Sequence, residues 1–352
     1  MDLLKKRIIL FGKSNKDVRS IKQNFIDQND LLLRKSNLKG KIYKSQKRRN
    51  LCKACGKKLK GSYFISHLIK YILCNSCTHL NGNFQDSETF ANKIYLSKKI
   101  NYSKNYNEEK FENYLNRVKK IYIPKAKFLK QNFKNYKKIK ILDIGSGSGY
   151  FISALTKQGF PEVRGIEISN DQVRYGKKML SKQKIKTDIL LNMKFSNIME
   201  LVKRTKFNCI SVIGVLEHLT QMRDFLKNIK TNKNIKFIYL SVPLFSFTCV
   251  FESIFDKVNN RHLAGSHTHL FTEKSLKRLL REFSFKSHSE WWFGLDFNDL
   301  YRSINVMSNK KKNSGLDKMV ESFYNMVDEF QIAVDKKKMS SEVHILFKRQ
   351  ER

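Results

Sequence analysis

Short, nearly continuous apolar runs alternate with longer amphipathic stretches along most of this chain. Four such runs begin at residues 138, 163, 207 and 236, and residues 271–283 repeat apolar positions at helical spacing. Continuous apolar runs are typical of strands buried on both faces of a parallel sheet, and the stretches between them are long enough for helices. The pattern predicts an α/β fold, a doubly wound sheet covered by helices.

Outside these runs, the chain divides into segments of different character. Residues 1–50 form a basic N-terminal extension, in which 7–25 could be a strand and a helix or a docking arm for a partner. We predict a cysteine-rich module over 51–105. A catalytic domain follows over 106–349; it ends in two strands, 285–293 and 342–349, with a helical insert at 296–338 between them.

Four of the six cysteines form two CxxC pairs. They are Cys52, Cys55, Cys74 and Cys77. Four thiolates close the coordination sphere of one tetrahedral ion, so we expect a structural Zn²⁺ site. Two disulfides, or redox-active CxxC motifs, are the alternative interpretation, and His79 could replace one cysteine ligand. Cys209 and Cys249 lie in apolar surroundings and are expected to be small buried side chains.

The formal net charge of +39 bears on the partners of the chain. Clustered Lys and Arg attract phosphates, so a nucleic acid is one compatible partner, and residues 34–49 form a basic run that could hold a phosphate backbone. However, Lys greatly outnumbers Arg, whereas Arg is the residue that phosphate and base recognition favours. Abundant Lys, Asn and Ile are also typical of proteins from AT-rich genomes, so genome composition is another explanation of the positive charge. A nucleotide-linked small molecule would also be attracted by the positive field. The oligomeric state cannot be read from the sequence.

Nothing in the sequence suggests export or membrane insertion. Residues 1–15 contain only a short apolar run without a small-residue cleavage site. The longest uncharged stretch, 237–251, is interrupted by Pro243 and is shorter than the roughly 20 apolar residues that span a bilayer. We therefore expect a cytoplasmic protein without a membrane span.

A glycine-rich loop follows the first strand of the predicted sheet. Gly145, Gly147 and Gly149 come after Asp143 and before a helix that begins near Tyr150. Glycines let the backbone approach a ligand closely, and the free amides at a helix start favour polar or negative groups. The dinucleotide fingerprint GxGxxG requires a small residue where this chain has Tyr150. This spacing, together with Asp143 and with Glu167 at the end of the next strand, favours S-adenosylmethionine over NAD.

The second strand ends in Glu167, whose carboxylate is placed to accept hydrogen bonds from both hydroxyls of a ribose. Together, LDIGSGSG and GIEIS resemble motif I and the acidic strand end of class I S-adenosylmethionine-dependent methyltransferases. The segment FNCISVIGVLEHL resembles the fourth-strand motif of that superfamily, with Asn208 where many relatives have Asp. The resemblance covers residues 106–349 and implies a seven-stranded sheet whose last strand runs antiparallel.

The resemblance also implies which residues hold the cofactor. Asp143 and the glycine loop would contact the methionine part, Glu167 the ribose, and Asn192 the adenine, although many relatives have an acidic residue at this last position. The full set that we expect is Asp143, Gly145, Ser146, Gly147, Gly149, Glu167, Ile168, Asn192, Met193, Gly214 and Val215.

Three histidines and one glutamate are candidate catalytic residues. His218 follows Glu217 at the carboxyl end of the fourth strand, where doubly wound sheets bind their substrates. His267 and His269 lie in the loop before residues 271–283, a region that faces the acceptor in the resembling family. Histidine suits proton removal near neutral pH. For each of them, a packing or capping role stays open.

The methyl acceptor is the least determined feature. CxxCG ahead of this catalytic domain, the Tyr-rich stretch 102–114, HLAGSHTHLFTEKSLKRLL and WWFGLDFNDLY are similar to methyltransferases of nucleotide-linked sugars in surface polysaccharide or antibiotic pathways. Some ribosomal RNA guanine methyltransferases also place a four-ligand zinc site before a class I domain, so an RNA base is the alternative acceptor. A catalytically silent scaffold is a third interpretation. Whether carbon, nitrogen or oxygen is methylated stays open.

Overall fold

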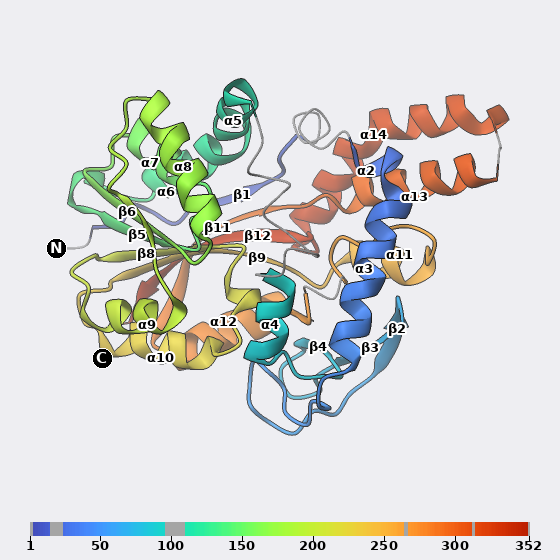
Figure 1. Cartoon of the computed structure of the whole chain (residues 1–352), viewed down its shortest axis with the longest axis horizontal. Coiled ribbons are helices and arrows are strands. Elements are labelled where there is room, and N and C mark those ends of the chain that lie inside the picture. Colours follow the sequence, from blue (N-terminus) through green and yellow to red (C-terminus); the bar gives the residue numbers. More distant parts are fainter. Residues whose placement is uncertain (1–2, 15–23, 96–109, 264–266, 312–313, 351–352) are drawn as a thin grey trace.

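The computed structural model describes residues 3–14, 24–95, 110–263, 267–311 and 314–350. One large sheet lies at its centre, with strand order β1-β11-β12-β9-β8-β5-β6-β7 (Figure 1). The strands are β1 (Ile9–Phe11), β5 (Lys140–Ile144), β6 (Glu162–Glu167), β7 (Leu190–Asn192), β8 (Cys209–Ile213), β9 (Phe237–Pro243), β11 (Phe285–Phe293) and β12 (Glu342–Arg349). Strands β5 to β9 pair in parallel, and β12 is antiparallel to both of its neighbours. The predicted α/β fold with a mostly parallel sheet is confirmed.

The predicted count of seven strands is wrong for this sheet, which has eight strands in the described part of the chain. The additional strand is β1, which pairs in parallel with β11 at the edge of the sheet. The Gly12 amide donates to the Trp292 carbonyl oxygen at 2.9 Å, and the Glu290 amide donates to the Ile8 carbonyl oxygen at 3.0 Å. β1 thus satisfies backbone groups that β11 would otherwise leave unpaired.

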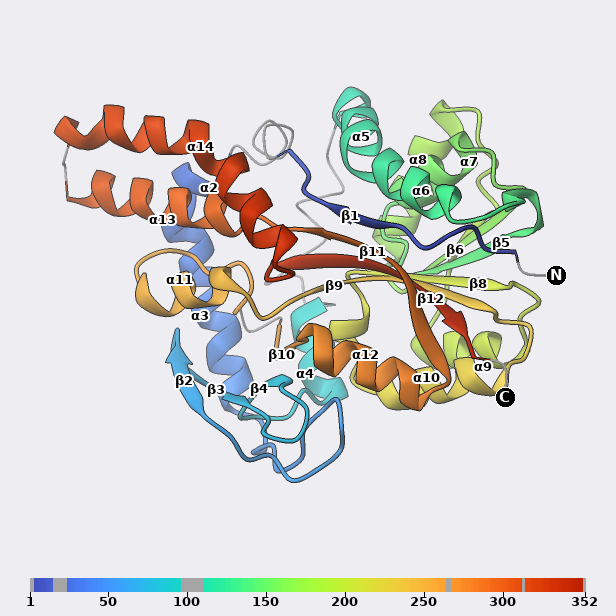
Figure 2. The same cartoon turned by 180° about the vertical axis from the view of Figure 1, so that it is seen from behind.

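Helices cover both faces of the large sheet (Figures 1 and 2). One layer contains α5 (Phe111–Arg117), α6 (Ile123–Gln131), α7 (Tyr150–Lys157) and α8 (Asn170–Lys182), and the other contains α9 (Phe195–Arg204), α10 (Met222–Thr231) and α12 (Glu273–Glu282). Each layer buries its own apolar cluster against the sheet. This two-layer burial explains why the strands read as continuous apolar runs. Within the described ranges, the helices are too short or too polar to cross a membrane.

A second, four-stranded sheet lies beside the large one, in the order β10-β4-β3-β2. Its strands are β2 (Tyr63–Ser66), β3 (Ile69–Leu73), β4 (Leu80–Gly82) and β10 (His269–Leu270), all antiparallel. Three of these strands come from the cysteine-rich segment, but β10 comes from the loop that follows β9 and α11 (Phe247–Ile254). The small sheet is therefore hydrogen-bonded directly to a loop of the catalytic domain.

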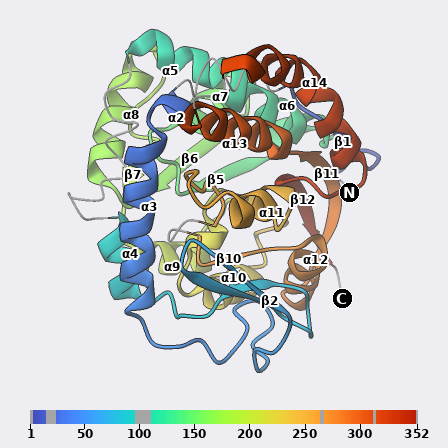
Figure 3. The same cartoon turned by 90° about the vertical axis from the view of Figure 1, so that its right-hand side faces the viewer.

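The N-terminal helix α3 (Asn29–Lys44), preceded by the short α2 (Asn24–Asp27), runs along one side of the molecule (Figure 3). At its start, Asp30 accepts from Lys310 Nζ at 2.6 Å. At its end, the buried Tyr43 packs against the rings of Phe84 and Phe90, the latter in α4 (Glu88–Tyr95). Helix α3 thus connects the insert helices to the small sheet.

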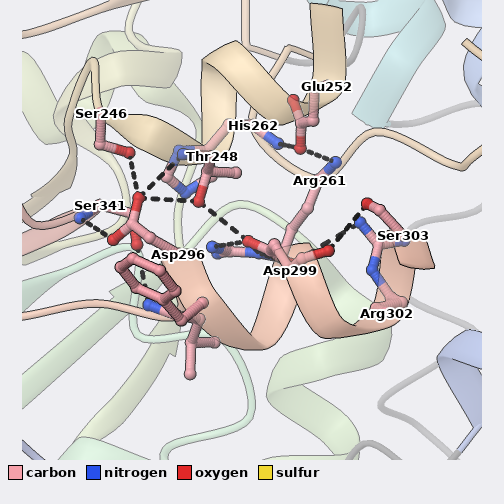
Figure 4. Close-up of polar contacts among 12 residues, drawn as sticks. Ser246, Thr248, Glu252, Arg261, His262, Asp296, Asp299, Arg302, Ser303 and Ser341 are labelled. Carbon is pink, nitrogen blue, oxygen red and sulfur yellow. Dashed lines mark hydrogen bonds and ion pairs between the residues drawn. The ribbon is translucent and has the colours of Figure 1, made fainter. Parts of the chain in front are cut away.

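The stretch 296–338 contains two helices, α13 (Asp296–Lys310) and α14 (Asp317–Lys336), which project side by side from the end of the sheet (Figures 1 and 2). A buried polar network ties α13 to the catalytic domain (Figure 4). The Asp296 carboxylate accepts from Ser246 Oγ at 2.6 Å, from the Thr248 amide at 2.9 Å and from the Ser341 amide at 2.9 Å. Asp296 is fully buried, so these bonds replace its hydration.

We expect replacement of Asp296 by alanine to lower the free energy of unfolding by about 3–5 kcal/mol, because it leaves several buried donors without an acceptor. Urea denaturation followed by circular dichroism measures this change. Replacement of the exposed Asp256 by alanine is the matched control and should change stability by less than about 0.5 kcal/mol. Equal effects of the two substitutions would contradict the structural importance of the network.

Candidate cofactor and acceptor site

A cavity of about 490 Å³ opens at the carboxyl ends of β5, β6 and β8. Ligand pockets in proteins typically measure about 300–1,000 Å³, and open α/β sheets bind their ligands at this edge. The walls also include the segment after β11, residues of α4 and α5, and Lys13 from the N-terminal segment. The cavity therefore combines the predicted glycine-loop site with parts of the chain that are distant in sequence.

The glycine loop has the backbone conformation that its sequence predicts. Gly145, Gly147 and Gly149 have φ angles of 73°, 54° and 75°, which residues other than glycine rarely adopt. A Cβ atom at Gly145 would lie 2.4 Å from Cγ2 of Val215, so this position also needs the absence of a side chain. Gly149 begins α7 and packs against Leu190 rather than lining the cavity.

Two buried carboxyl groups lie in the floor of the cavity. Asp143 Oδ1 accepts from Ser211 Oγ at 2.6 Å, and burial raises the pKa of Asp143 to about 7. Glu167 accepts from the Gly147 amide at 2.9 Å and from the Ser169 amide at 2.8 Å. Burial also raises the pKa of Glu167. These hydrogen bonds fix the Glu167 carboxylate against the loop, and lone pairs of its two oxygens remain for a ligand.

Most of the expected cofactor residues line this one cavity: Asp143, Gly145, Ser146, Gly147, Glu167, Ile168, Gly214 and Val215. Asn192 and Met193 do not line it. The Asn192 side-chain amide donates to the carbonyl oxygens of Glu167 and Ile168, each at 3.0 Å, and the Met193 amide donates to the Glu167 carbonyl at 3.0 Å. Asn192 and Met193 therefore support the backbone at Glu167, whose carboxyl group lines the cavity.

Glu217, His218 and His267 lie together beside the cavity, directly after the carboxyl end of β8 in the case of Glu217 and His218. His218 lines the cavity, and its ring stacks on that of His267 with centroids 4.9 Å apart. Glu217 Oε1 lies 3.8 Å from His218 Nε2. Glu217 is only 2% exposed, and burial raises the pKa of its carboxyl group to about 8. Both Glu217 and His218 belong to a short 3₁₀ turn, Leu216–His218, directly after β8.

The structure does not bring His269 to the cavity. His269 lies in β10, fully buried, with Nδ1 2.9 Å from His79 Nε2. Burial lowers the pKa of His79 to about 3 and holds that of His269 well below its usual value. Both imidazoles are therefore neutral near pH 7 and pack between the small sheet and α12.

Several residues of the cavity wall were not predicted from the sequence. They are Lys13, Arg117, Tyr122, Lys125, Gln172, Phe293 and Glu342, among others. Tyr122 ends a π-helical turn, Val118–Tyr122, that joins α5 to α6, and its ring stacks on that of Tyr150 with centroids 5.3 Å apart. Lys125 Nζ lies 3.5 Å from Glu342 Oε1. These residues give the cavity an aromatic and cationic part in addition to the glycine loop and the two carboxyl groups.

The four predicted cysteine ligands lie in one cluster, with all four Sγ atoms within 4.8 Å of one another. The Sγ atoms of Cys52 and Cys77 are 3.6 Å apart, and those of Cys55 and Cys74 are 3.9 Å apart. A disulfide requires about 2.05 Å, whereas thiolates about 2.3 Å from a tetrahedral zinc ion lie near 3.8 Å from each other. The cluster fits a Zn²⁺ ion and not two disulfides.

Comparison with known proteins adds the family. Residues 114–290, half of the chain, match the family model described as a methyltransferase domain. This chain belongs to that family. The matched residues include the glycine loop, Glu167 and the Glu217, His218 and His267 cluster. The protein therefore contains a methyltransferase domain.

Solved structures similar to this methyltransferase share little sequence with it. Magnesium protoporphyrin IX methyltransferase from Synechocystis PCC 6803 is 10% identical, with a TM-score of 0.47. The superposition includes 75% of this chain and 100% of that chain. A SAM-dependent methyltransferase from Archaeoglobus fulgidus is 13% identical, with a TM-score of 0.41, over 68% of this chain and 100% of that chain. The methyltransferase domain of bacterial CtHen1 is 14% identical, with a TM-score of 0.41, over 67% of this chain and 97% of that chain. No curated protein matches the methyltransferase in sequence.

We expect the affinity of this methyltransferase for S-adenosylmethionine to rise with pH up to about 7 and then to level off. Asp143 has a pKa of about 7 in the free protein, so it is protonated below that pH. The ammonium and sulfonium charges of the cofactor favour the carboxylate, and binding at lower pH must therefore release the proton. The affinity should fall by up to about tenfold per pH unit below 7.

Isothermal titration calorimetry between about pH 5.5 and 8 measures this dependence. Replacement of Asp143 by asparagine is the control, since the variant carries no titrating group at this position. It should bind more weakly and lose most of the pH dependence. An unchanged pH dependence in the variant would assign the effect to another group.

Proposed function

We propose that the protein transfers the methyl group of S-adenosylmethionine to a hydroxyl group of a nucleotide-linked sugar in the cytoplasm. The observation that carries this proposal is the composition of the single cavity. Its lining contains the glycine loop and Glu167 together with Lys125, Arg117 and Tyr122. A diphosphate favours cationic side chains, and a base or sugar ring favours an aromatic wall.

In this proposal, the cofactor lies along the carboxyl ends of β5 and β6. Glu167 accepts from the ribose hydroxyls, and the backbone around Gly145 and Gly147 approaches the methionine part with Asp143 beneath it. Ile168 and Val215, which both line the cavity, contact the adenosine. Asn192 and Met193 support this site through the backbone of Glu167. Gly149 contributes through the start of α7.

The acceptor is proposed to lie between the cofactor and the cationic wall. Its hydroxyl oxygen forms a bond to the methyl carbon as the carbon–sulfur bond breaks, sulfur keeps the electron pair, and the hydroxyl proton is released. His218, at the cavity lining, is the side chain placed to receive that proton. Most of the rate enhancement should come from alignment of oxygen, carbon and sulfur and from exclusion of water.

The cysteine cluster is proposed to hold a structural zinc ion that positions the acceptor side. The Asn81 side-chain amide donates to Cys52 Sγ at 3.5 Å, and Asn81 pairs with His269 of β10. His267 lies two residues before His269 on the same loop. The zinc ion would therefore fix the small sheet, and the small sheet would fix the loop that carries His267.

An assay with labelled methyl groups separates this acceptor from its rivals. The purified protein is incubated with methyl-labelled S-adenosylmethionine and a cell extract, and the extract is then divided into RNA and nucleotide-sugar fractions. Replacement of Gly147 by arginine, which fills the cofactor side, is the negative control. We expect label in the nucleotide-sugar fraction that this variant does not produce.

Label that remains with RNA and disappears after ribonuclease treatment would contradict the proposal in favour of an RNA methyltransferase. The net charge of +39 is compatible with that alternative. The absence of label from both fractions, together with absence of measurable cofactor binding, would instead favour a scaffold without catalytic activity.

A further inference from the structure

Glu217, His218 and His267 have the composition and geometry of a second metal site, separate from the cysteine cluster. Each side chain offers one ligand atom, and the three atoms all lie within 4.8 Å of one another. Two imidazoles and one carboxylate are a donor set that holds divalent transition metals and leaves coordination positions open. Because His218 lines the cavity, open positions would face the bound molecules.

The carboxylate of Glu217 supplies an independent indication of a ligand. Its Oε2 atom is buried and has no hydrogen-bond partner in the described part of the chain. A buried oxygen atom without a hydrogen-bond partner costs about 1–3 kcal/mol. A cation held by the Glu217 carboxylate, whose Oε1 lies 3.8 Å from His218 Nε2, would stabilise the charge that burial disfavours.

The surroundings of His267 orient it as a ligand. His267 Nδ1 lies 2.9 Å from the carbonyl oxygen of His262, so Nδ1 carries the hydrogen and Nε2 presents a lone pair. Metal-bound histidines commonly donate their other N–H to a carbonyl in this way. The His262 amide is itself held by Glu252 Oε1 at 2.8 Å, within the buried network of α11 and α13 (Figure 4).

From these contacts we infer that Glu217, His218 and His267 bind a divalent transition-metal cation, such as Mn²⁺ or Zn²⁺, which coordinates the acceptor hydroxyl. The cation lowers the pKa of the coordinated hydroxyl and fixes its oxygen relative to the methyl group. Without the cation, His218 receives the hydroxyl proton as proposed above. With the cation bound, His218 is a ligand and the proton passes to a water molecule instead. The role of the cation toward the acceptor rests on the proposed function, whereas its binding does not.

Electron paramagnetic resonance of Mn²⁺ tests the binding directly. The zinc-loaded full chain is titrated with Mn²⁺ without cofactor or acceptor, and the loss of the free Mn²⁺ signal measures binding. We expect one equivalent of Mn²⁺ per chain. Glu217→Gln and His267→Ala should each weaken binding at least about tenfold, since loss of an outer partner alone costs about 10–100-fold. Glu88→Gln, which changes an exposed carboxylate of the same cavity, is the matched control and should bind normally.

Circular dichroism verifies that each variant is folded before it is titrated. Absence of bound Mn²⁺ in the wild type, with no competing Zn²⁺ beyond one equivalent per chain, would overturn the inference. Binding that survives in both Glu217→Gln and His267→Ala would do the same. Because the titration requires no methyl transfer, failure of the acceptor assay would leave this result unaffected, and failure of the titration would leave the acceptor assay unaffected.

Discussion

Replacement of Gly145 by alanine is expected to abolish most of the cofactor affinity. At this position φ is 73°, and a Cβ would lie 2.4 Å from Cγ2 of Val215. The loop would have to move away from Val215, and both residues line the cavity in which we place the cofactor. We expect the dissociation constant for S-adenosylmethionine to rise at least about tenfold, which corresponds to about 1.4 kcal/mol.

Gly159 provides a matched control for this substitution. Its φ of 79° carries the same backbone strain, of about 1–2 kcal/mol for alanine, but a Cβ there would meet its nearest neighbour at 3.7 Å. Gly159→Ala should therefore lose a similar amount of stability and keep its affinity for the cofactor. Calorimetric titration of both variants measures the difference. An affinity for S-adenosylmethionine that falls equally in Gly145→Ala and Gly159→Ala would indicate a general loss of stability rather than a steric clash with Val215.

Replacement of Cys74 by serine is expected to remove zinc from the protein and to loosen the small sheet. Structural zinc sites contribute about 10–16 kcal/mol of apparent binding free energy in isolated zinc-finger peptides at pH 7. Without the ion, the cysteine cluster has little apolar packing to hold it, because within the described part of the chain its hydrophobic cluster adds Ala54 and Leu59 to the four cysteines. Zinc content should fall from one equivalent to a small fraction per chain.

Hydrogen exchange measures the structural consequence of the Cys74 substitution. We expect faster exchange of the amides of β3, β4 and β10, while those of β5 and β6 stay protected. Cys249→Ala is the control: Cys249 is buried with Tyr71 and Leu270 and does not belong to the zinc cluster, so zinc should be retained. Full zinc occupancy in both variants would contradict the four-cysteine site.

The parts of the fold that depend on local sequence could be predicted. The apolar run before Asp143, the glycines after it and the acidic end of β6 all lie within one continuous segment, which consists of a strand, a loop, a helix and the next strand. Their roles are local, because the backbone conformation of the loop follows from its glycines. The close spacing of the two CxxC pairs likewise brought four cysteine side chains together. Local spacing therefore located the cavity and the cysteine cluster.

Features that depend on long-range packing could not be predicted. A strand within residues 7–25 was one of the interpretations of the sequence, but no local pattern encodes that β1 joins β11 across most of the chain. The difference between His267 and His269 has the same origin, because only the pairing of β10 with β4 buries His269 against His79. Lys13 and Glu342 lie at opposite ends of the sequence and meet only in the folded cavity.

A crystal structure of the protein with S-adenosylhomocysteine tests the central claim most directly, since that claim places cofactor and acceptor in one cavity. We predict that the ribose hydroxyls contact Glu167, the amino-acid part lies over Gly145 and Asp143, and the sulfur atom points toward His218 and the wall of Lys125. Product bound outside this cavity, or with its sulfur directed away from His218, would contradict the account.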